Sequence, residues 1–318
     1  MPTKMKLGIS SCLLGEKVRY DGGHKLDRFI TETLGQLVEF VPVCPEVECG
    51  LGVPREALHL VAAPDGPRLV TIRTQTDYTE RLLAWAQKRL VELEQEDLCG
   101  FIFKSGSPSN GMERVKIYSG KGKPARTGVG LFARAFMQHF PLLPVEDEGR
   151  LHDPALRENF LESLFTMKRW RETVALGASR GHLVDFHTRH KLLIMSHSPR
   201  HYRLLGKLVA RVKEIPLPEA YEQYQTRLME ALRLKSTIKK NVNVLLHVMG
   251  YFKRNLAEAE KVELLEIINN YRLGYIPLIV PVTLLNHFVR KYDQLYLKTQ
   301  YYLDPHPVEL KLRNQFLS

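Results

Sequence analysis

The periodicity of apolar residues changes near residue 150, and this change limits the folds that the chain can adopt. Before it, short β-branched runs alternate with amphipathic stretches, which is typical of a parallel sheet covered by helices. After it, only amphipathic stretches broken by Gly, Pro or polar clusters remain. The 318 residues exceed what one hydrophobic core usually serves. We therefore predict an α/β domain over 1–150 and an all-α domain over 151–318, with the seam in the polar segment 145–154.

The pattern predicts the individual elements as well. Strands are expected at 6–11, 38–44, 68–73 and 99–105, and helices at 26–35, 77–96 and 128–140. In the second half, helical segments are expected at 157–174, 183–197, 201–215, 219–235, 238–256, 259–274 and 281–292. No apolar run approaches the roughly 18 residues of a membrane span, so we expect a cytoplasmic protein that does not contact a membrane. The sequence leaves the oligomeric state open.

The two halves differ in charge. Residues 1–150 contain 20 Lys and Arg against 19 Asp and Glu, whereas residues 151–318 contain 26 against 16. The second half also holds nine of the twelve histidines. A basic domain beside a neutral one favours a polyanionic partner, most simply nucleic acid. The alternative is a lysine-rich helical surface that only keeps the protein in solution.

Two helical stretches of the basic half are candidates for contacts with nucleic acid. The candidates are His187, Arg189, His190, Lys191, Lys239, Lys240, Lys253 and Arg254. His187 and Lys191 are four residues apart and therefore share a helix face, where they could meet phosphates or stacked bases. For the histidines, packing and roles at helix ends are the alternative.

Three loops rich in Gly and Pro each follow a predicted strand: 10–23, 44–56 and 104–118. In open α/β sheets ligands bind at the carboxyl ends of the strands, and a parallel sheet would bring these loops to one edge. The glycines and prolines mark fixed turns with little side-chain bulk, as a cofactor pocket needs. This edge is the predicted functional site.

The cysteines suggest what the site could hold. Cys12 and Cys44 stand where strands are expected to end, and Cys49 shares the loop of Cys44 with Glu46 between them. In a reducing cytoplasm such residues are thiols, metal ligands or catalytic groups. Thiolates beside glycine-rich backbone suit an iron–sulfur cluster or zinc. The C-x4-C spacing of Cys44 and Cys49 is not a zinc signature, so the spacing alone does not establish a metal site. Two other interpretations of these cysteines remain open: buried structural thiols and a catalytic nucleophile.

The third loop places Lys104, three serines and Asn110 between glycines. Its backbone N–H groups could cradle an anion, although the Gly-Lys-Ser/Thr order of a P-loop is missing. An ordinary polar turn is the alternative.

Taken together, segments 9–23, 41–56 and 100–111 resemble the thiouracil desulfidase family, TudS. Its members carry an S-x-C-L-x-G-x-x-x-R-Y-D-G start, a C-P-E motif and a K-S-x-S-P-S-C-G loop. The resemblance covers about residues 5–150. Residues 151–318 resemble the YbgA-like helical domain that is often fused to it. The whole chain is thus similar to RudS-type fusions, which are regarded as tRNA 4-thiouridine desulfidases.

The resemblance implies a [4Fe-4S] cluster held by three cysteines. An iron without a protein ligand would take the thiocarbonyl sulfur, water would attack the ring carbon, and the base would become uracil. In the family's pattern the carboxylate and the hydroxyl that move protons fall on Glu46 and Ser105. Residues expected around them and the substrate are Tyr20, Lys104, Ser107 and Asn110. The basic domain would bind the tRNA.

The chain departs from this pattern at one ligand. Asn110 stands where the family has its third cysteine, and Cys49 is an additional cysteine in the second loop. We therefore predict that the ligand set is Cys12, Cys44 and Cys49. The alternative is two thiolates with a weaker ligand, which would make a labile cluster or none. Cys99 is expected at the opposite edge of the sheet in a structural role.

Two other functions fit the same residues. One is a non-catalytic nucleic-acid-binding or redox-sensing iron–sulfur protein. The other is a desulfidase of free thiobases with an unrelated helical appendage. A free base needs no basic partner domain, so the charge of the second half favours RNA.

Overall fold

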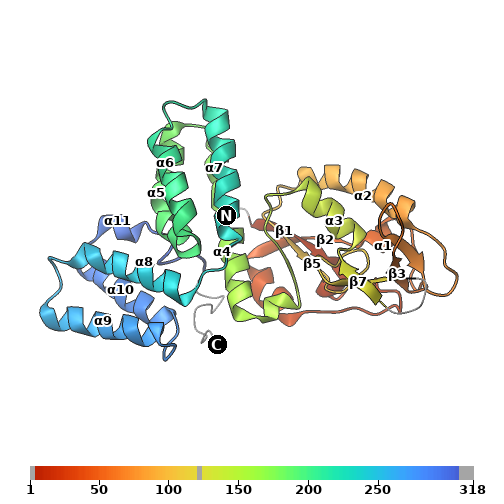
Figure 1. Ribbon diagram of the computed structural model, residues 1–318, viewed down its shortest axis with the longest axis horizontal. Coiled ribbons are helices and arrows are strands. Elements are labelled where there is room, and N and C mark those ends of the chain that lie inside the picture. The colour runs from red at the N-terminus through yellow and green to blue at the C-terminus, as the bar shows by residue number, and fades with distance from the viewer. Residues whose placement is uncertain (1–3, 120–123, 308–318) are drawn as a thin grey trace. The chain divides into compact units, whose positions relative to one another are not determined.

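The computed structural model describes residues 4–119 and 124–307, and the chain forms two compact units, Met1–Asp153 and Pro154–Ser318. The first unit is an α/β domain and the second is helical (Figure 1), as the sequence predicted.

A parallel sheet forms the centre of the first unit. Its strands are β1 (Met5–Ser10), β2 (Val38–Val43), β5 (Phe101–Phe103) and β8 (Val145–Asp147), in the order β2-β1-β5-β8. All three pairings are parallel, so the carboxyl ends of the four strands lie at one edge. The register pairs Ser10 with Val43 and Phe103 with Asp147.

A second, mixed sheet lies between β2 and β8 in the sequence. Its strands are β4 (Arg68–Thr71), β3 (Leu58–Val61), β6 (Val115–Tyr118) and β7 (Pro124–Gly128), in this order. The strand predicted at 68–73 belongs to this sheet and not to the parallel one. Strands β3, β6, β7 and β8 were not predicted from the sequence, because they are short and lack a strong apolar alternation.

Helices and aromatic rings cover the parallel sheet. The helices of this unit are α1 (Pro45–Glu48), α2 (Thr79–Glu94) and α3 (Leu131–His139), and α2 packs on α3 (Figure 1). The ring of Phe101 on β5 lies 4.6 Å from that of Phe136 on α3, and Trp85 on α2 lies 5.4 Å from Phe132. The helix predicted at 26–35 is instead a π-helical turn, Phe29–Thr33, followed by a 3-10 turn, Leu34–Gln36.

The second unit consists of helices joined by short turns. They are α4 (Pro154–Ala175), α5 (Arg180–His197), α6 (Pro199–Ala210), α7 (Leu217–Leu232), α8 (Ile238–Met249), α9 (Glu258–Arg272), α10 (Ile279–Lys291) and α11 (Leu295–Lys298). Side-chain oxygens cap three of them: those of Ser179, Ser198 and Thr237 accept from backbone N–H groups at the starts of α5, α6 and α8.

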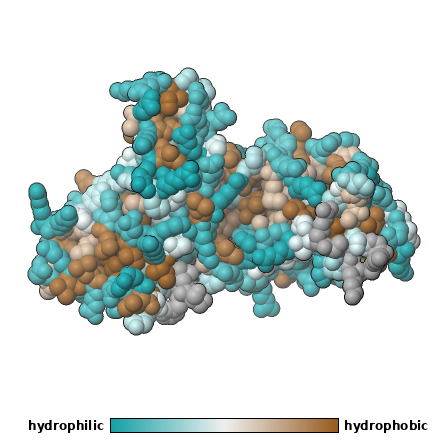
Figure 2. Space-filling view, viewed as in Figure 1, coloured by the Kyte–Doolittle hydropathy of each residue, from teal (hydrophilic) through white to brown (hydrophobic). Residues whose placement is uncertain are grey.

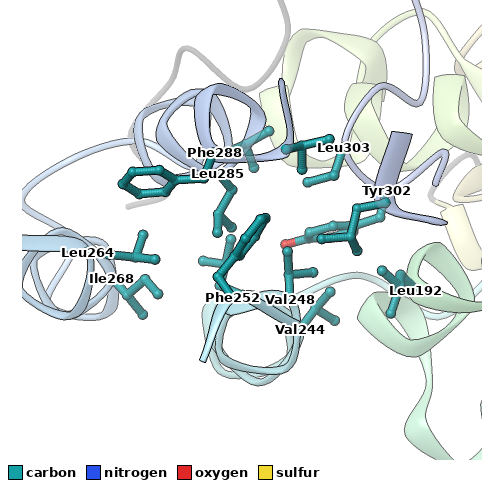
Figure 3. Close-up of a cluster of buried hydrophobic side chains, with 14 of the residues drawn as sticks. Leu192, Val244, Val248, Phe252, Leu264, Ile268, Leu285, Phe288, Tyr302 and Leu303 are labelled. Atoms are coloured by element: carbon teal, nitrogen blue, oxygen red, sulfur yellow. The ribbon is translucent and has the colours of Figure 1, made fainter. Parts of the chain in front are cut away.

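Apolar side chains from α5, α8, α9 and α10 converge on one core (Figure 3). Phe252 and Tyr302 are fully buried there, beside Leu285 and Phe288. Polar atoms inside this core are paired: the Tyr302 hydroxyl donates to Asn241 Oδ1 at 3.2 Å, and Asn241 Nδ2 donates to the Tyr271 hydroxyl at 3.2 Å. These two hydrogen bonds pair polar side chains inside the core.

Figure 2 shows hydrophilic residues over most of the visible face, with hydrophobic residues gathered around α9 and α10. Exposed apolar residues on and beside these helices include Val262, Leu265, Tyr275 and Val280. Within the described ranges, no helix is long and apolar enough to cross a membrane.

Gly8 allows β1 to lie against β5. An ideal Cβ at this position would collide with the ring of Phe101 and crowd Leu98, both of which are buried. We predict that Gly8→Ala destabilises the first unit by about 1–3 kcal/mol, because the packed core must shift to accept a methyl group. Hydrogen exchange resolved by peptide should show faster exchange in β1 and β5, with α8 to α10 unchanged.

Gly52→Ala is the matched control, because an added Cβ there meets nothing closer than 4.0 Å. Equal protection in both variants would contradict the role given to Gly8.

Candidate functional site

A cavity of about 260 Å³ opens where β1, β2 and β5 end. Eight of the residues predicted from the sequence line it: Cys12, Tyr20, Cys44, Glu46, Lys104, Ser105, Ser107 and Asn110. The three loops therefore converge as expected from the parallel sheet.

Hydrogen bonds between strand ends fix the floor of this cavity. The Lys104 amide donates to Ser10 Oγ at 2.9 Å, which ties the end of β5 to the end of β1. After β1 the chain makes a 3-10 turn, Ser11–Leu14, and the Cys12 carbonyl accepts from the Lys25 amide at 2.8 Å. These contacts hold Cys12 in place beside the cavity.

Cys12 and Cys44 are both buried. Burial raises the pKa of Cys12 to about 11, with a smaller opposing effect of Lys104. Burial and the carboxylate of Glu46 raise the pKa of Cys44 to about 12. Both thiols are therefore neutral near pH 7, and a bound cation would be needed to convert them to thiolates.

Glu46 lies at the centre of the second loop's contacts. Its Oε1 accepts from Ser109 Oγ at 2.5 Å, and its Oε2 lies 3.7 Å from Cys44 Sγ and 3.9 Å from Arg55 Nη2. Arg55 also donates to the Val18 carbonyl at 2.9 Å, so it joins the first and second loops. A carboxylate so placed faces both a thiol and the cavity.

Ser105 and Lys104 share a second carboxylate, that of Glu148. Glu148 Oε1 accepts from Lys104 Nζ at 2.6 Å and from Ser105 Oγ at 2.7 Å, and Oε2 accepts from the Ser105 amide at 2.7 Å. Burial alone would raise the pKa of Glu148, but the hydrogen bonds from Lys104 and Ser105 outweigh it and hold this pKa below its usual value. The Ser105 hydroxyl is thus oriented by a charged acceptor.

Cys49, the third cysteine of the predicted ligand set, differs from Cys12 and Cys44 in its surroundings. Its residue does not line the cavity, and its thiol lies 3.3 Å from the Glu46 carbonyl. Cys44 and Cys49 flank the short helix α1. Among the described residues, no three Cys, His, Asp or Glu side chains form a possible metal-binding group.

Cys99 precedes β5, at the end of that strand opposite the cavity. Its amide donates to the Lys6 carbonyl at 2.9 Å, and the residue is buried. This position fits the structural role expected for Cys99.

Sequence reasoning missed three residues of the site: Arg55, Ser109 and Glu148. Glu148 belongs to the polar segment predicted as the seam between the domains, although it directly follows β8. Arg55 and Ser109 stand inside the loops that were singled out, but only their partners show what they do. Because β8 was not predicted, the sequence offered no strand end that could have identified Glu148.

The helical unit has a separate groove of about 410 Å³ between α5 and α6. His187 and Lys191 of α5 line it, together with Tyr202, Arg203 and Lys207 of α6. Burial and the nearby Lys191 lower the pKa of His187 to about 4, and His187 Nδ1 lies 3.1 Å from the Tyr224 hydroxyl. His187 is therefore neutral, and the charge of the groove comes from the lysines and Arg203.

His190 is a core residue, which corrects its prediction as a contact for nucleic acid. It is 1% exposed, its Nε2 accepts from Arg169 Nε at 3.0 Å, and its ring stacks on Phe186 at 3.8 Å. Helix α5 is buried on several sides. The spacing of three residues between His187 and His190 therefore did not identify its exposed face.

The other predicted cations lie on or near the surface. Arg189 is exposed and pairs with Asp185 at 2.8 Å. Lys239, Lys253 and Arg254 are exposed, and Lys240 is partly buried with its Nζ donating to the Lys235 carbonyl at 2.7 Å.

Comparison with known proteins matches each half of the chain to a family. Residues 7–148 match the sequence model described as 2-thiouracil desulfurase, and residues 191–307 match that of a protein family of unknown function, DUF1722. The uncharacterized protein YbgA of Escherichia coli (strain K12) is 32% identical over 158 residues, which cover 49% of this chain and 94% of YbgA. The chain belongs to the YbgA family.

This member of the YbgA family is also similar to a solved structure. That structure is the [4Fe-4S]-dependent thiouracil desulfidase TudS, which is 29% identical in sequence. The match covers 49% of this chain and 98% of the TudS chain, with a TM-score of 0.40. The two family matches confirm the predicted fusion of a thiouracil desulfurase domain with a YbgA-like domain.

The contacts of Glu148 predict a pH-dependent contribution to stability. Because the pKa of Glu148 is lowered by folding, its contribution is present above the usual glutamate pKa of 4.5 and is lost as the pH falls through the folded value. Glu148→Gln should therefore destabilise the first unit by about 2 kcal/mol near pH 7 and by progressively less below pH 4.5. Urea unfolding followed by Trp85 fluorescence, with Trp170→Phe in all proteins compared, measures this difference.

Glu32→Gln is the control, because Glu32 is exposed and its side chain has no hydrogen bond within the described residues. A destabilisation by Glu148→Gln that stays constant from pH 7 into the acid range would contradict the ionised state assigned to Glu148.

Proposed function

We propose that this protein is an iron–sulfur-dependent desulfidase that converts a thiouracil base to uracil, with 4-thiouridine in tRNA as the substrate. The observation that carries the proposal is the convergence of two buried thiols, the Glu46 carboxylate and the Ser105 hydroxyl on one cavity. The match of residues 7–148 to the 2-thiouracil desulfurase family supports the same reaction class.

The donor atoms of the cavity fit the cluster that TudS uses. Thiolates are the usual ligands of iron–sulfur clusters, and Cys12 and Cys44 supply two. Asn110 also lines the cavity, and its Oδ1 is buried without a hydrogen-bond partner. When bound, the cluster would supply a Lewis-acidic iron that attracts the thiocarbonyl sulfur.

The reaction needs proton transfers that the chain's own residues can provide. Water supplies the oxygen that joins the ring carbon, the C–S bond breaks, and sulfur leaves at the oxidation level of sulfide, so no external oxidant or reductant is required. Glu46, held by Ser109 and facing the cavity, is placed to take a proton from water. Ser105, oriented by Glu148 and next to Lys104, is placed to give a proton to the ring or to the leaving sulfur.

We infer that RNA binds to the groove between α5 and α6. Lys191, Arg203 and Lys207 offer positive charge to phosphates, and Tyr202 offers a ring for base stacking. Lys191 Nζ lies 4.8 Å from the centre of the Tyr296 ring, which stacks on Tyr251 at 5.1 Å. Cations and aromatic rings thus continue beyond the groove, as in surfaces that bind single-stranded nucleic acid.

The desulfidase proposal predicts sulfur loss that depends on Glu46. Anaerobically reconstituted protein should convert 4-thiouridine in tRNA to uridine, and Glu46→Gln should slow this conversion by about 100-fold or more, because general acid–base catalysis contributes on that order. Mass spectrometry of digested tRNA measures the product. The free base and the nucleoside, supplied side by side, should react more slowly than tRNA.

Glu56→Gln is the matched control, since Glu56 belongs to the same loop but binds Thr74 outside the cavity. A protein that binds a cluster and RNA but releases no sulfur from any of the three substrates would support the non-catalytic alternative. Equal rates on the free base and on tRNA would contradict the RNA substrate.

The RNA groove predicts a loss of affinity from local charge reversal. Lys207→Glu and Arg203→Glu should each weaken tRNA binding and should lower the slope of log affinity against log salt by about 1 for each lost phosphate contact. Lys88→Glu makes the same charge change at an exposed residue of α2 in the first unit and should preserve this slope. An equal loss of tRNA affinity in Lys88→Glu and in the groove variants would show that the affinity depends only on the net charge of the protein.

A further inference from the structure

One residue that lines the groove between α5 and α6 is a nearly buried histidine. His187 is 8% exposed, and its Nδ1 lies 3.1 Å from the Tyr224 hydroxyl. Its Nε2 makes no hydrogen bond within the described residues and is not one of the buried atoms that lack a partner, so it keeps accessible surface. One nitrogen of the ring is therefore bound to the protein, and the other is available to the groove.

The Tyr224 hydroxyl determines which nitrogen of His187 carries the proton. Tyr224 is fully buried, its ring stacks on Trp170 at 5.4 Å, and burial raises the pKa of its hydroxyl well above the usual value. Its one hydrogen bond within the described residues is to His187 Nδ1. Because a buried O–H group without an acceptor is unfavourable, the hydroxyl donates to Nδ1. The proton of the neutral imidazole is then on Nε2.

The surroundings of His187 keep the ring uncharged. The charged and titratable groups that face it are Lys191 on its own helix, Tyr224 on α7, and Tyr202, Arg203 and Lys207 on α6. None of the described residues that line the groove carries a carboxylate. Burial and the nearby Lys191 lower the pKa of His187 to about 4. Its Nε2–H group is therefore a neutral donor near pH 7.

Gly206 leaves space next to this donor. It lies inside α6 and lines the groove, although glycine in a helix interior is less favourable than alanine. An ideal Cβ at Gly206 would lie 3.9 Å from His187 Nε2, which is an ordinary van der Waals distance, so alanine would fit. The methyl group of alanine would occupy the space beside Nε2. A ligand in that space accounts for a glycine that packing does not require.

The groove suits an anionic oxygen beside Nε2. Lys191, Arg203 and Lys207 line it and attract anions. A lysine ammonium is a compact charge on a flexible stem, so it attracts a phosphate without fixing its position. The N–H group of a packed ring has a fixed direction, and a hydrogen bond from it to an anionic oxygen is stronger than one between neutral groups.

We propose that His187 Nε2–H donates a hydrogen bond to a phosphate oxygen of the RNA in the groove between α5 and α6. The lysines and Arg203 supply attraction, and His187 sets the position of one phosphate. This inference rests on the proposed function, in which RNA binds to this groove.

Variants of His187 test the donor directly. Binding of tRNA to the full chain is measured by fluorescence anisotropy at several salt concentrations, at pH 6 and at pH 8. His187→Leu should raise the Kd by about tenfold, as expected for a hydrogen bond to a charged group. The slope of log affinity against log salt should stay unchanged, because a neutral donor releases no counterion. His187→Gln, whose amide N–H can reach the position of Nε2, should keep most of the affinity.

Gly206→Ala separates the effect on the ligand from the effect on folding. It should raise the Kd for tRNA several-fold, whereas the melting temperature should stay the same or rise, because alanine fits and favours the helix. Gly181→Ala is the matched control. A Cβ at Gly181 of α5 also has its nearest neighbour at 3.9 Å, which is Ser179 Oγ, and Gly181 does not line the groove. This control should bind tRNA as the wild type does.

Three results would overturn the proposal. One is an unchanged Kd in His187→Leu with normal circular dichroism. Another is a larger loss of affinity at pH 6 than at pH 8, or a reduced salt slope in His187→Leu, since either would mean a charged imidazole. The third is a loss of affinity in His187→Leu that comes with a lower melting temperature while Gly206→Ala binds normally, because His187 would then act only in packing.

The proposed function can fail separately from this inference. Unchanged tRNA affinity in Lys207→Glu and Arg203→Glu would overturn the RNA groove and the role of His187 together. Binding of tRNA that depends on these residues and on His187, without removal of sulfur, would overturn the desulfidase activity and support the phosphate contact.

Discussion

The parallel pairing of β1, β2, β5 and β8 is the constraint on which the site depends. Its register sets Ser10 opposite Val43 and Phe103 opposite Asp147. Cys44 and Glu148 are each the next residue after a paired strand end, and Cys12 follows Ser10 by two residues. Residues more than 130 positions apart in the sequence, such as Cys12 and Glu148, therefore lie at the same edge of the sheet.

Two carboxylates organise this edge in the same way. Glu46 accepts from Ser109, and Glu148 accepts from Ser105 and Lys104. In each pair a hydroxyl faces a carboxylate from another loop, so the carboxylates orient side chains as well as carry charge. Arg55 adds a cation near Glu46 and bonds to the first loop through the Val18 carbonyl. The three loops are thus joined by polar contacts around the cavity, while apolar packing lies beneath them.

The helical unit divides its histidines between the core and the surface. His190 and His197 are buried, with His197 Nε2 2.8 Å from Glu162 Oε2 and Nδ1 2.9 Å from the Leu234 carbonyl. His187 contacts Tyr224 and also lines the groove. The high histidine content of this half therefore reflects internal hydrogen bonding as much as a basic surface. Its positive charge resides on lysines and arginines such as Arg203 and Lys207, which are exposed.

By itself the sequence determined the features that depend on near neighbours along the chain. Apolar periodicity located the helices of the second half, and the expected strand ends predicted a site at Cys12 and Cys44, which both line the cavity. Only the tertiary structure decided which of their companions face the cavity. It left Cys49 out of the cavity lining, placed Glu148 beside Ser105, buried His190 and left the buried Asn110 Oδ1 without a hydrogen-bond partner. These outcomes depend on strand register and on which side of a helix is covered, and neither is encoded in local spacing.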